Sequence, residues 1–493
     1  MGRPTAMSGF PEFLPTHRFV EQHVVEQLRR TFELHGFAPV ETRAVEPLEQ
    51  LLSKGETSKE VYVLRRLQAE VERDASSDAG IGLHFDLTVP FARYVLENAG
   101  KLEFPFRRYQ IQKVWRGERP QEGRYREFTQ ADIDIVGRDV LGFHHDVEVA
   151  RVMAEALTAL PVPALRLQVN NRKLIQGFYA GIGAGDVDAV MRVVDKIDKF
   201  PPEVVAGMLR EDAGLDEAQA GQCLRLAGIR SRDTSFVEQV RGLGVEHELL
   251  DQGLDELAAV LDGCADVSGD RLVVEADLRI ARGLDYYTGT VFETVMEGFE
   301  SLGSVCSGGR YDALASDGRT TYPGVGISLG VSRMLVPLLT SGRLGASRSV
   351  PSVVLVALTD EGSRDSSTDV ARRLRARGIP AEVAPHAQKF GRQIRYADRR
   401  GIPFVWFPGD VTGDVAGDVT GGVTGNVSGK GAFDVSGDQV KDIRSGAQSD
   451  ADADSWNPPA ADLRPQVTGL DVQSVTPPGS TPASPPPSKE PFS

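Results

Sequence analysis

Residues 114–137 hold the side chains best placed for chemistry, because they read as two strands joined by a long charged loop. In the second strand, Gln130, Asp132 and Asp134 alternate with apolar residues. Side chains two residues apart in a strand point to the same face. Carboxylates and an amide aligned on one face of a strand suit a pocket for a polar, cationic ligand.

The loop of this hairpin carries arginines beside the acidic strand. They are Arg116, Arg119, Arg124 and Arg126. Guanidinium groups present forked donors that match the oxygens of a phosphate. The hairpin therefore offers anion-binding arginines next to a cation-binding strand. The alternative is a solvated hairpin with exposed charge pairs, which explains most charge-rich hairpins.

Further segments are predicted to frame the hairpin. Apolar residues recur at helical spacing over residues 20–32, and Gly36 follows as a stop signal, which predicts an amphipathic helix packed on a sheet. Residues 146–160 predict a second helix that covers the sheet, whereas the charged residues 65–79 predict a surface loop.

Polar and glycine-rich strands supply more candidate residues. Residues 83–90, LHFDLTVP, predict a short strand ended by its proline, with Asp86 and Thr88 on one side. Glycine-rich sequence follows much later, at residues 307–312 and 324–335. A glycine inside a strand usually marks close approach of its backbone to another group.

The chain is predicted to form several units, since 493 residues allow roughly three domains. Residues 170–270 are rich in alanine, leucine, glutamate and aspartate at helical period, which predicts an inserted helical module. Strand-like sequence returns at residues 272–276 and 288–296. The predicted core therefore consists of residues 1–169 and 271–345.

A small α/β unit is predicted over residues 350–470. Strands alternate with helices there, which indicates a mostly parallel sheet. The predicted elements are strands at residues 353–358, 380–383 and 402–407 and helices at residues 368–377 and 390–400. The second helix has a basic face made of Lys389, Arg392, Arg395, Arg399 and Arg400. This face is either a solvated surface or a binding surface.

Low-complexity segments are predicted to lie outside any core. Residues 409–429 repeat a unit with glycine at every fourth position, which offers too little apolar bulk to order itself. The nonapeptide spacing of a calcium-binding β-roll is absent. We interpret the repeat as a flexible insertion within the α/β unit, followed by structured sequence at residues 439–445. The Pro/Ser/Thr-rich residues 471–493 are predicted to be disordered.

Composition narrows the class of protein. A net charge of -15 argues against non-specific coating of nucleic acid but allows local basic patches for one specific RNA. The three cysteines lie far apart without metal-ligand spacing, so we expect reduced thiols and no metal site. No apolar run approaches the roughly 20 residues of a membrane span, and no signal-peptide h-region is present. The sequence predicts a soluble cytoplasmic protein that binds neither membranes nor DNA.

The hairpin belongs to a series of motifs that follow a fixed order. They are residues 36–47, the hairpin at 106–137, Arg282-Gly283-Leu284-Asp285-Tyr286-Tyr287, Ser307-Gly308-Gly309-Arg310-Tyr311-Asp312, and residues 324–333. Together they resemble the histidyl-tRNA synthetases. The first, second and last stand where motifs 1, 2 and 3 of class II aminoacyl-tRNA synthetases stand, and the other two resemble the histidine-specific motifs.

The resemblance implies an α/β (α+β) fold, with an antiparallel sheet flanked by helices, a helical insertion and a C-terminal α/β anticodon-binding domain. It implies a homodimer that ligates L-histidine to tRNA(His), with ATP as a substrate and Mg²⁺ accompanying the ATP. Histidine and ATP would give histidyl-adenylate, and the 3′ end of the tRNA would then accept histidine. The first step joins two negative groups, so the catalyst must mainly position them and stabilise charge.

The resemblance also implies roles for individual residues. Arg116 would grip the histidine carboxylate and the α-phosphate. Arg282 would hold the α-phosphate in place of a magnesium ion, and Arg333 would hold the γ-phosphate. Structural salt bridges are the alternative for these arginines. Arg119 and Gln121 would approach the acceptor end of the tRNA, and the basic helix would face the anticodon stem.

The implied amino-acid pocket is polar. Asp86 and Thr88 would receive the α-ammonium group, with Gln130 nearby. The imidazole would bind Asp134 and Tyr287, and the pocket would be completed by Leu87, Tyr286 and Tyr311. Such a pocket discriminates well between histidine and other amino acids, because an analogue that lacks a partner atom leaves buried donors and acceptors of the pocket without a hydrogen bond. Core packing with a satisfied hydroxyl is the alternative for the tyrosines.

Two positions depart from the family pattern. Arg43 stands where motif 1, which serves the dimer interface, has a proline, and Ser332 stands where motif 3 has a glutamate.

Two other functions compete with the histidine-ligating one. One is that of a paralogue without charging activity, such as the regulatory subunit of ATP phosphoribosyltransferase, which lacks an anticodon-binding domain. A synthetase for proline or threonine is the other, and Asp134 with the run at residues 282–287 argues against it.

Overall fold

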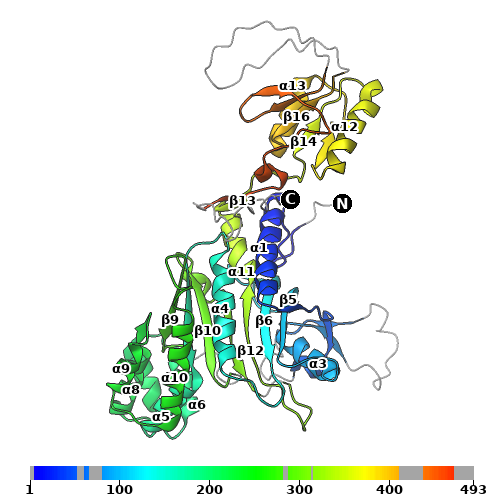
Figure 1. Cartoon of the computed structure of the whole chain (residues 1–493). Coiled ribbons are helices and arrows are strands. Elements are labelled where there is room, and N and C mark those ends of the chain that lie inside the picture. Colours follow the sequence, from blue (N-terminus) through cyan, green and yellow to red (C-terminus); the bar gives the residue numbers. More distant parts are fainter. Residues whose placement is uncertain are drawn as a thin grey trace, which may run out of the picture.

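The computed structural model of the chain describes residues 5–52, 60–65, 80–280, 287–312, 315–409 and 437–470. A large sheet with helices packed on it forms one unit, and a smaller α/β unit lies beyond one end of helix α1 (Pro15–Leu34) (Figure 1). Three predicted segments lie wholly or almost wholly outside the described residues: the loop at 65–79, the repeat at 409–429 and the tail at 471–493.

The central feature is a mixed sheet, for which the described residues supply nine strands. Their spatial order is β1-β5-β6-β12-β11-β10-β7-β9-β8, and neighbours are antiparallel except for the pairs β1/β5 and β7/β9. The strands are β1 (Ala38–Pro39), β5 (Phe106–Trp115), β6 (Glu127–Val136), β7 (Leu165–Asn171), β8 (Arg230–Ser231), β9 (Leu272–Asp277), β10 (Thr290–Met296), β11 (Cys306–Tyr311) and β12 (Gly324–Gly330). The centre of the sheet is antiparallel, as the resemblance implied.

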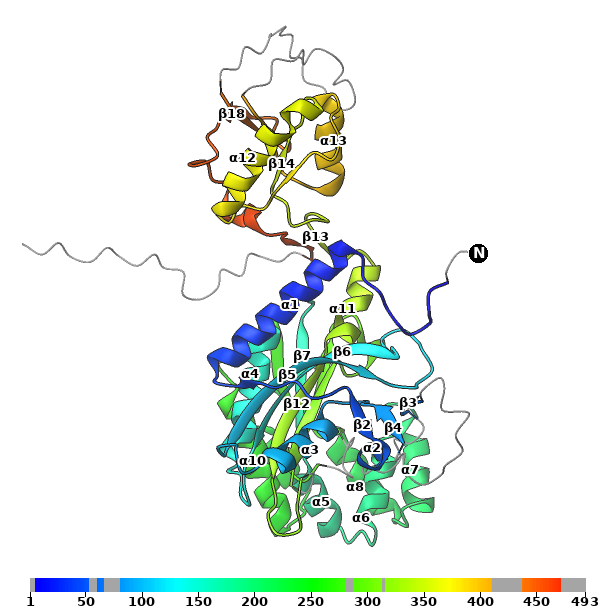
Figure 2. The same ribbon diagram turned by 90° about the vertical axis from the view of Figure 1, so that its right-hand side faces the viewer.

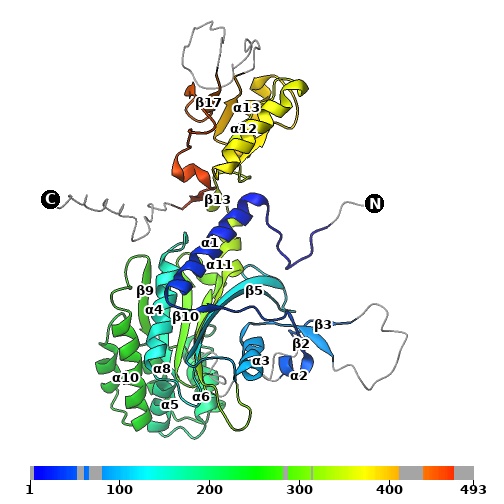
Figure 3. The same ribbon diagram turned by 45° about the vertical axis from the view of Figure 1, so that its right-hand side comes forward.

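Helices cover one face of this sheet, namely α1, α4 (His144–Thr158) and α11 (Val331–Thr340) (Figure 1 and Figure 3). The apolar residues of β6 that alternate with its polar ones, Ala131, Ile133 and Ile135, are fully buried on this side. Phe32 of α1 is equally buried. Gly36 follows α1 with a φ of 76°, the left-handed conformation that glycine adopts readily after a helix. Both predicted covering helices are confirmed.

The opposite face of the sheet meets α3 (Thr88–Asn98) near a small sheet of β2 (Val45–Pro47), β3 (Val63–Leu64) and β4 (Ile81–Leu83). The strand predicted at residues 83–90 is wrong, because β4 ends at Leu83 and the chain turns into α3. Asp86 stabilises the start of α3, because its Oδ1 accepts a hydrogen bond of 3.0 Å from the backbone N–H of Val89, in the first helical turn. Pro90 fits the same turn, where its missing N–H costs nothing.

Helices that the sequence predicted over residues 170–270 connect β7 to β9. These two strands are parallel, so a crossover must join them. The helices are α5 (Arg172–Gly181), α6 (Val187–Val194), α7 (Pro202–Glu211), α8 (Glu217–Ala227), α9 (Phe236–Arg241) and α10 (Glu248–Gly263). Helices α5 and α10 pack backbone to backbone, since a Cβ on Gly177 or Gly253 would overlap with the main chain of the other helix.

The smaller unit holds a second sheet in the order β15-β14-β16-β17-β18, with α12 (Arg364–Ala376) and α13 (Phe390–Arg400). Its strands are β14 (Val354–Val356), β15 (Ala381–Val383), β16 (Phe404–Phe407), β17 (Gln439–Asp442) and β18 (Gln448–Asp450). The first three strands in this order are parallel, as predicted. Asp438 joins the two sides of the chain around residues 410–436, because it accepts hydrogen bonds from the Trp406 indole at 2.9 Å and the Gly409 N–H at 2.8 Å.

A short ribbon lies between the two units. In it β13 (Leu344–Ala346) pairs with β19 (Val467–Gly469), beside α1 (Figure 2). The predicted reduced thiols are confirmed, since all three cysteines are buried and unbridged. Within the described ranges, no helix is long and apolar enough to cross a membrane.

Candidate active site

The sheet face turned away from α1, α4 and α11 is polar where β6 and β12 meet. Gln130, Asp132 and Asp134 share this face, as predicted. The residues opposite them in β12 are Gly330, Ser328 and Gly326. Directly opposed residues of antiparallel strands lie on the same face. Acidic and amide groups therefore stand over a floor of small residues.

Two glycines on adjacent strands create room on this floor. A Cβ on Gly326 of β12 would overlap with the carboxylate of Asp134. A Cβ on Gly309 of β11 would lie 2.7 Å from the ring of Tyr287. Gly326 and Gly309 are paired with each other in the sheet. The glycine-rich strands thus allow the close approach that the sequence predicted, by Asp134 and Tyr287.

Asp134 is the centre of a buried network. It is 4% exposed, and Arg108 Nη2 lies 2.6 Å from its Oδ2. The hydroxyl of Tyr311 donates to its Oδ1 at 2.7 Å. The guanidinium of Arg108 also lies over the ring of Phe91 in α3, 4.3 Å from its centroid. The predicted pocket residues Asp134 and Tyr311 are therefore in direct contact.

Asp132 and Gln130 are buried without full hydrogen bonding. Asp132 is 2% exposed, and its Oδ1 has no hydrogen-bond partner. Gln130 donates through Nε2 to the hydroxyl of Ser328 at 3.1 Å, while its Oε1 also has no partner. Burial raises the pKa of Asp132 to about 7, against the opposing effect of Arg108. A group with such a perturbed pKa in a cleft is a candidate for function.

The segment before α3 lies over this face. Arg108 Nη2 donates to the backbone oxygen of Leu87 at 3.5 Å. Arg116 Nε donates to the backbone oxygen of Phe85 at 3.0 Å. Asp86 and Asp134 both raise the pKa of Asp132, after burial, which shows that the three carboxylates are electrostatic neighbours. Asp86 thus reaches the predicted pocket from a helix start and not from a strand.

Arg116, Arg124 and Arg333 bring positive charges together beside the pocket. Arg333 lies in the first turn of α11, where its Nη2 donates to Leu302 O and its Nε is buried without a partner. Burial, followed by the charges of Arg124 and Arg116, lowers the pKa of Arg333. Glu118 offsets part of this charge, because it lies 3.3 Å from Arg124 Nη1 and 4.0 Å from Arg116 Nη1. Three guanidinium groups against this one carboxylate still leave the cluster positively charged. This cluster is therefore suited to phosphate.

The structure describes three of the five remaining predicted residues in the loop and the motif at 282–287, namely Arg119, Gln121 and Tyr287. Arg119 and Gln121, at the tip of the loop between β5 and β6, are both exposed, and the backbone of Gln121 bridges to Arg124. Arg282 and Tyr286 lie outside the described residues. Tyr287 is the first residue after that gap, and Arg172 Nη1 donates to its backbone oxygen at 3.1 Å. Burial raises the pKa of the Tyr287 hydroxyl, and the charge of Asp134 adds to the effect.

Ser332 and Arg43, which depart from the motif pattern, both have hydrogen-bond partners. Ser332 is buried, and its hydroxyl accepts a hydrogen bond of 2.9 Å from the backbone N–H of Thr129. Arg43 is half exposed, and its Nη2 donates to Glu46 at 3.1 Å. Neither side chain introduces an unpaired charge next to Asp134.

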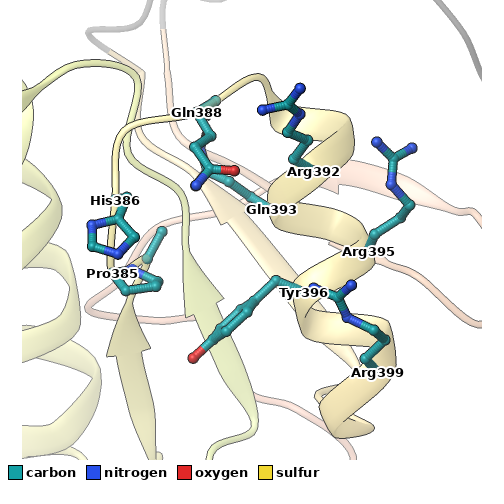
Figure 4. A pocket seen from close by; sticks show the side chains of 9 residues that line it. Pro385, His386, Gln388, Arg392, Gln393, Arg395, Tyr396 and Arg399 are labelled. Carbon is teal, nitrogen blue, oxygen red and sulfur yellow. Dashed lines mark hydrogen bonds between the residues drawn. The ribbon is translucent and has the colours of Figure 1, made fainter.

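A cleft lies on the smaller unit, along α13 (Figure 4). It measures about 450 Å³. Its lining includes Arg392, Arg395, Arg399 and Tyr396 from α13, with His386 from the preceding loop. The three arginines form no ion pair within the described part of the chain. Arg400 differs from the predicted basic face, because its guanidinium pairs with Glu382 at 2.6 Å.

Comparison with known sequences decides the family. A sequence model of histidyl-tRNA synthetase matches residues 9–334, and one of an anticodon binding domain matches residues 352–415. The chain belongs to the histidyl-tRNA synthetase family. A histidine–tRNA ligase of Cutibacterium acnes is 57% identical over 473 residues, which cover 95% of this chain and 100% of that protein. One of Micrococcus luteus is 58% identical over 476 residues, which cover 95% and 99%.

Solved structures agree with this assignment. The crystal structure of a histidyl-tRNA synthetase from Nostoc sp. PCC 7120 matches with a TM-score of 0.77 and 31% identity, over 92% of this chain and 98% of that one. An ATP phosphoribosyltransferase regulatory subunit/histidyl-tRNA synthetase from Bacillus halodurans matches with a TM-score of 0.64 and 20% identity, over 77% and 92%, which shows a shared fold alone. The expected fold class is confirmed.

Sequence reasoning missed two members of the site. It assigned no part to Arg108, although Arg108, Gln110 and Gln112 alternate with Tyr109 and Ile111 in the first strand of the hairpin. That alternation is the signal that could have found it. Asp132 was recognised as part of the polar face but received no role. Its unpartnered oxygen becomes visible only when the neighbouring strands are in place.

Proposed function

We propose that the polar face of the large sheet is where this chain joins histidine to ATP before transfer to tRNA. As a member of its family, the chain is a histidine–tRNA ligase that uses ATP. The observation that carries the siting is the position of the carboxylates Asp86, Asp132 and Asp134 beside the cluster of Arg116, Arg124 and Arg333, since Arg116 bonds to the backbone of Phe85, next to Asp86. One part suits an ammonium and an imidazole, and the other suits phosphates.

Histidine occupies the pocket over Gly309 and Gly326. Its α-ammonium group lies toward Asp86, Thr88 and Gln130, below Leu87. Its imidazole meets Asp134 and Tyr287, and the pocket is completed by Tyr286 and Tyr311. Rejection of other amino acids follows, because Asp134 is already held by Arg108 and Tyr311 and cannot turn away to find water.

ATP occupies the arginine cluster. Arg116 holds the histidine carboxylate and the α-phosphate, Arg282 the α-phosphate, and Arg333 the γ-phosphate. Their charges stabilise the negative charge of the reacting groups without any reorganisation. Mg²⁺ enters with ATP, held mainly by phosphates and water, as this ion prefers.

The tRNA contacts both units. Arg119 and Gln121 approach the acceptor end, and the cleft along α13 takes the anticodon side, where Arg392, Arg395 and Arg399 meet phosphates. We divide the chain into a catalytic core of residues 1–169 and 271–345, a helical insertion of residues 170–270, and an anticodon-binding unit of residues 350–470 interrupted by the repeat. We further propose a homodimer that works in the cytoplasm.

ATP–pyrophosphate exchange with each of the twenty amino acids tests the proposal. We expect exchange with histidine alone. Exchange with a different amino acid would contradict the pocket assignment. Histidine binding without any exchange would instead favour a regulatory paralogue. In both assays, Asp134→Asn serves as the site variant and the exposed Asp270→Asn as its matched control.

A further inference from the structure

Asp132 is a buried carboxylate of the polar face that is only partly hydrogen-bonded, with Ser328 as a side-chain partner. It is 2% exposed, and its Oδ1 meets no hydrogen-bond donor among the described residues. A buried carboxylate oxygen without a donor has lost its water and gained nothing in return, which is costly. Arg108 compensates for it only in part, because Arg108 Nη2 lies 2.6 Å from Asp134 but 3.9 Å from Asp132.

Groups from every neighbouring element face Asp132. Among the described residues they are Arg108 and Gln110 from β5, Gln130 and Asp134 from β6, Ser328 from β12, Asp86 before α3, and Tyr287. Acidic groups outnumber cationic ones in this set. A second buried acceptor without a partner, Gln130 Oε1, lies on the same strand face two residues away. The missing element is thus a cationic donor with several N–H groups.

We propose that Asp132 binds the α-ammonium group of histidine directly and shares it with Asp86. This assignment rests on the proposed function. A primary ammonium carries three N–H donors, which is enough for Asp86, Asp132 and Gln130 Oε1 together. Its charge also relieves the repulsion among the carboxylates of Asp86, Asp132 and Asp134. The imidazole end of the substrate remains with Asp134 and Tyr287.

Two analogues of histidine separate this role from a structural one. L-Histidinol keeps the ammonium and the imidazole but lacks the carboxylate, whereas 3-(imidazol-4-yl)propionate lacks the ammonium. Dissociation constants of both are measured by titration calorimetry, which needs no turnover, for the wild type and Asp132→Asn. We expect the variant to bind histidinol about 10- to 100-fold more weakly, the loss of one charge-assisted contact. Its affinity for the propionate should change less than about twofold, within ordinary context variation.

An equal loss for both analogues would overturn the proposal, because it would place Asp132 at the imidazole or in the support of the fold. Unchanged binding of both would overturn it as well. Asp132→Ser is the second variant and should repeat the pattern of Asp132→Asn, while the control Asp270→Asn should bind both analogues as the wild type does. Failure of the proposed function is seen separately, as a wild type without histidine-dependent ATP–pyrophosphate exchange.

Discussion

Two buried arginine–carboxylate pairs lie on opposite faces of the same sheet and differ in how completely they are bonded. On the helix side, Arg310 Nη2 donates to Asp146 at 2.7 Å, and Asp146 also accepts from the hydroxyl of Thr290 at 2.7 Å. On the polar side, Arg108 reaches Asp134 but keeps its own Nε without a partner. One network is closed, and the other has open positions.

The difference in hydrogen bonding indicates that the Arg310 network supports the fold, whereas the network around Asp132 is available to a ligand. Buried polar groups are normally all hydrogen-bonded, so a closed network such as that of Arg310 needs nothing further and fixes the position of its strand. Arg310 holds β11 against α4, which sets Tyr311 of the same strand over the opposite face. Open positions around Asp132 and Gln130 lower the stability of the free protein and become favourable when a ligand fills them.

Breaking the closed network should have the largest effect. Arg310→Met leaves the carboxylate of Asp146 buried without its cation, and we expect the free energy of unfolding to fall by about 3–5 kcal/mol. Urea denaturation followed by circular dichroism measures this. The double variant Arg310→Met/Asp146→Leu should recover part of the loss, since it buries no lone charge. A double variant as unstable as the single one would show that the pair is not the source of the stability.

A methyl group added to the polar face at Gly326 should lower activity more than it lowers the stability of the fold. In Gly326→Ala the new methyl group overlaps with the Asp134 carboxylate, which must move away from Arg108 and Tyr311. We expect kcat/KM for histidine in pyrophosphate exchange to fall about 100-fold or more, as a misplacement of this size commonly causes. Gly100→Ala, where an added Cβ meets nothing within 4 Å, is the matched control. Equal activities of the two variants would argue against the assigned pocket.

The open network should also respond to pH. The folded state holds the proton of Asp132 more tightly than the unfolded chain, because its pKa is raised from 3.8 to about 7. The contribution of this carboxyl to stability therefore falls as the pH rises from about 4 to 7 and is level above that. Without histidine, Asp132→Asn should be more stable than the wild type at pH 8 by up to about 4 kcal/mol, and the gap should close toward pH 4. Urea midpoints across this range measure it; a gap independent of pH would contradict the cause.

The arginines of the α13 cleft should have the smallest effect. They are exposed, so each contact with a phosphate is screened by water and salt. Arg395→Ala should raise KM for tRNA a few-fold, about the value of one surface phosphate contact, and leave histidine-dependent pyrophosphate exchange as it is. Aminoacylation at two salt concentrations measures this, with Arg400→Ala, whose charge is already paired with Glu382, for comparison. A loss of exchange would mean that α13 supports the core.

Much of the fold was predictable, because period and composition report burial directly. The alternation of β6, the amphipathic α1 and the helices between β7 and β9 all follow from which residues must avoid water. The error at residues 83–90 has a local cause. Asp86 and Pro90 are compatible with a strand end and with a helix start, and only the contacts of α3 with β5 and β6 choose between them.

The sequence by itself determined which residue types the site contains, since the motifs that resemble those of the family include Asp134, Tyr311 and Arg333. Tertiary structure decided how their bonds are shared. Arg108 lies 2.6 Å from Asp134 but 3.9 Å from Asp132. This difference between the two distances depends on the register of β5 and β6. Hydrogen bonds are that sensitive to distance, and strand register is set by the whole sheet and not by any one motif.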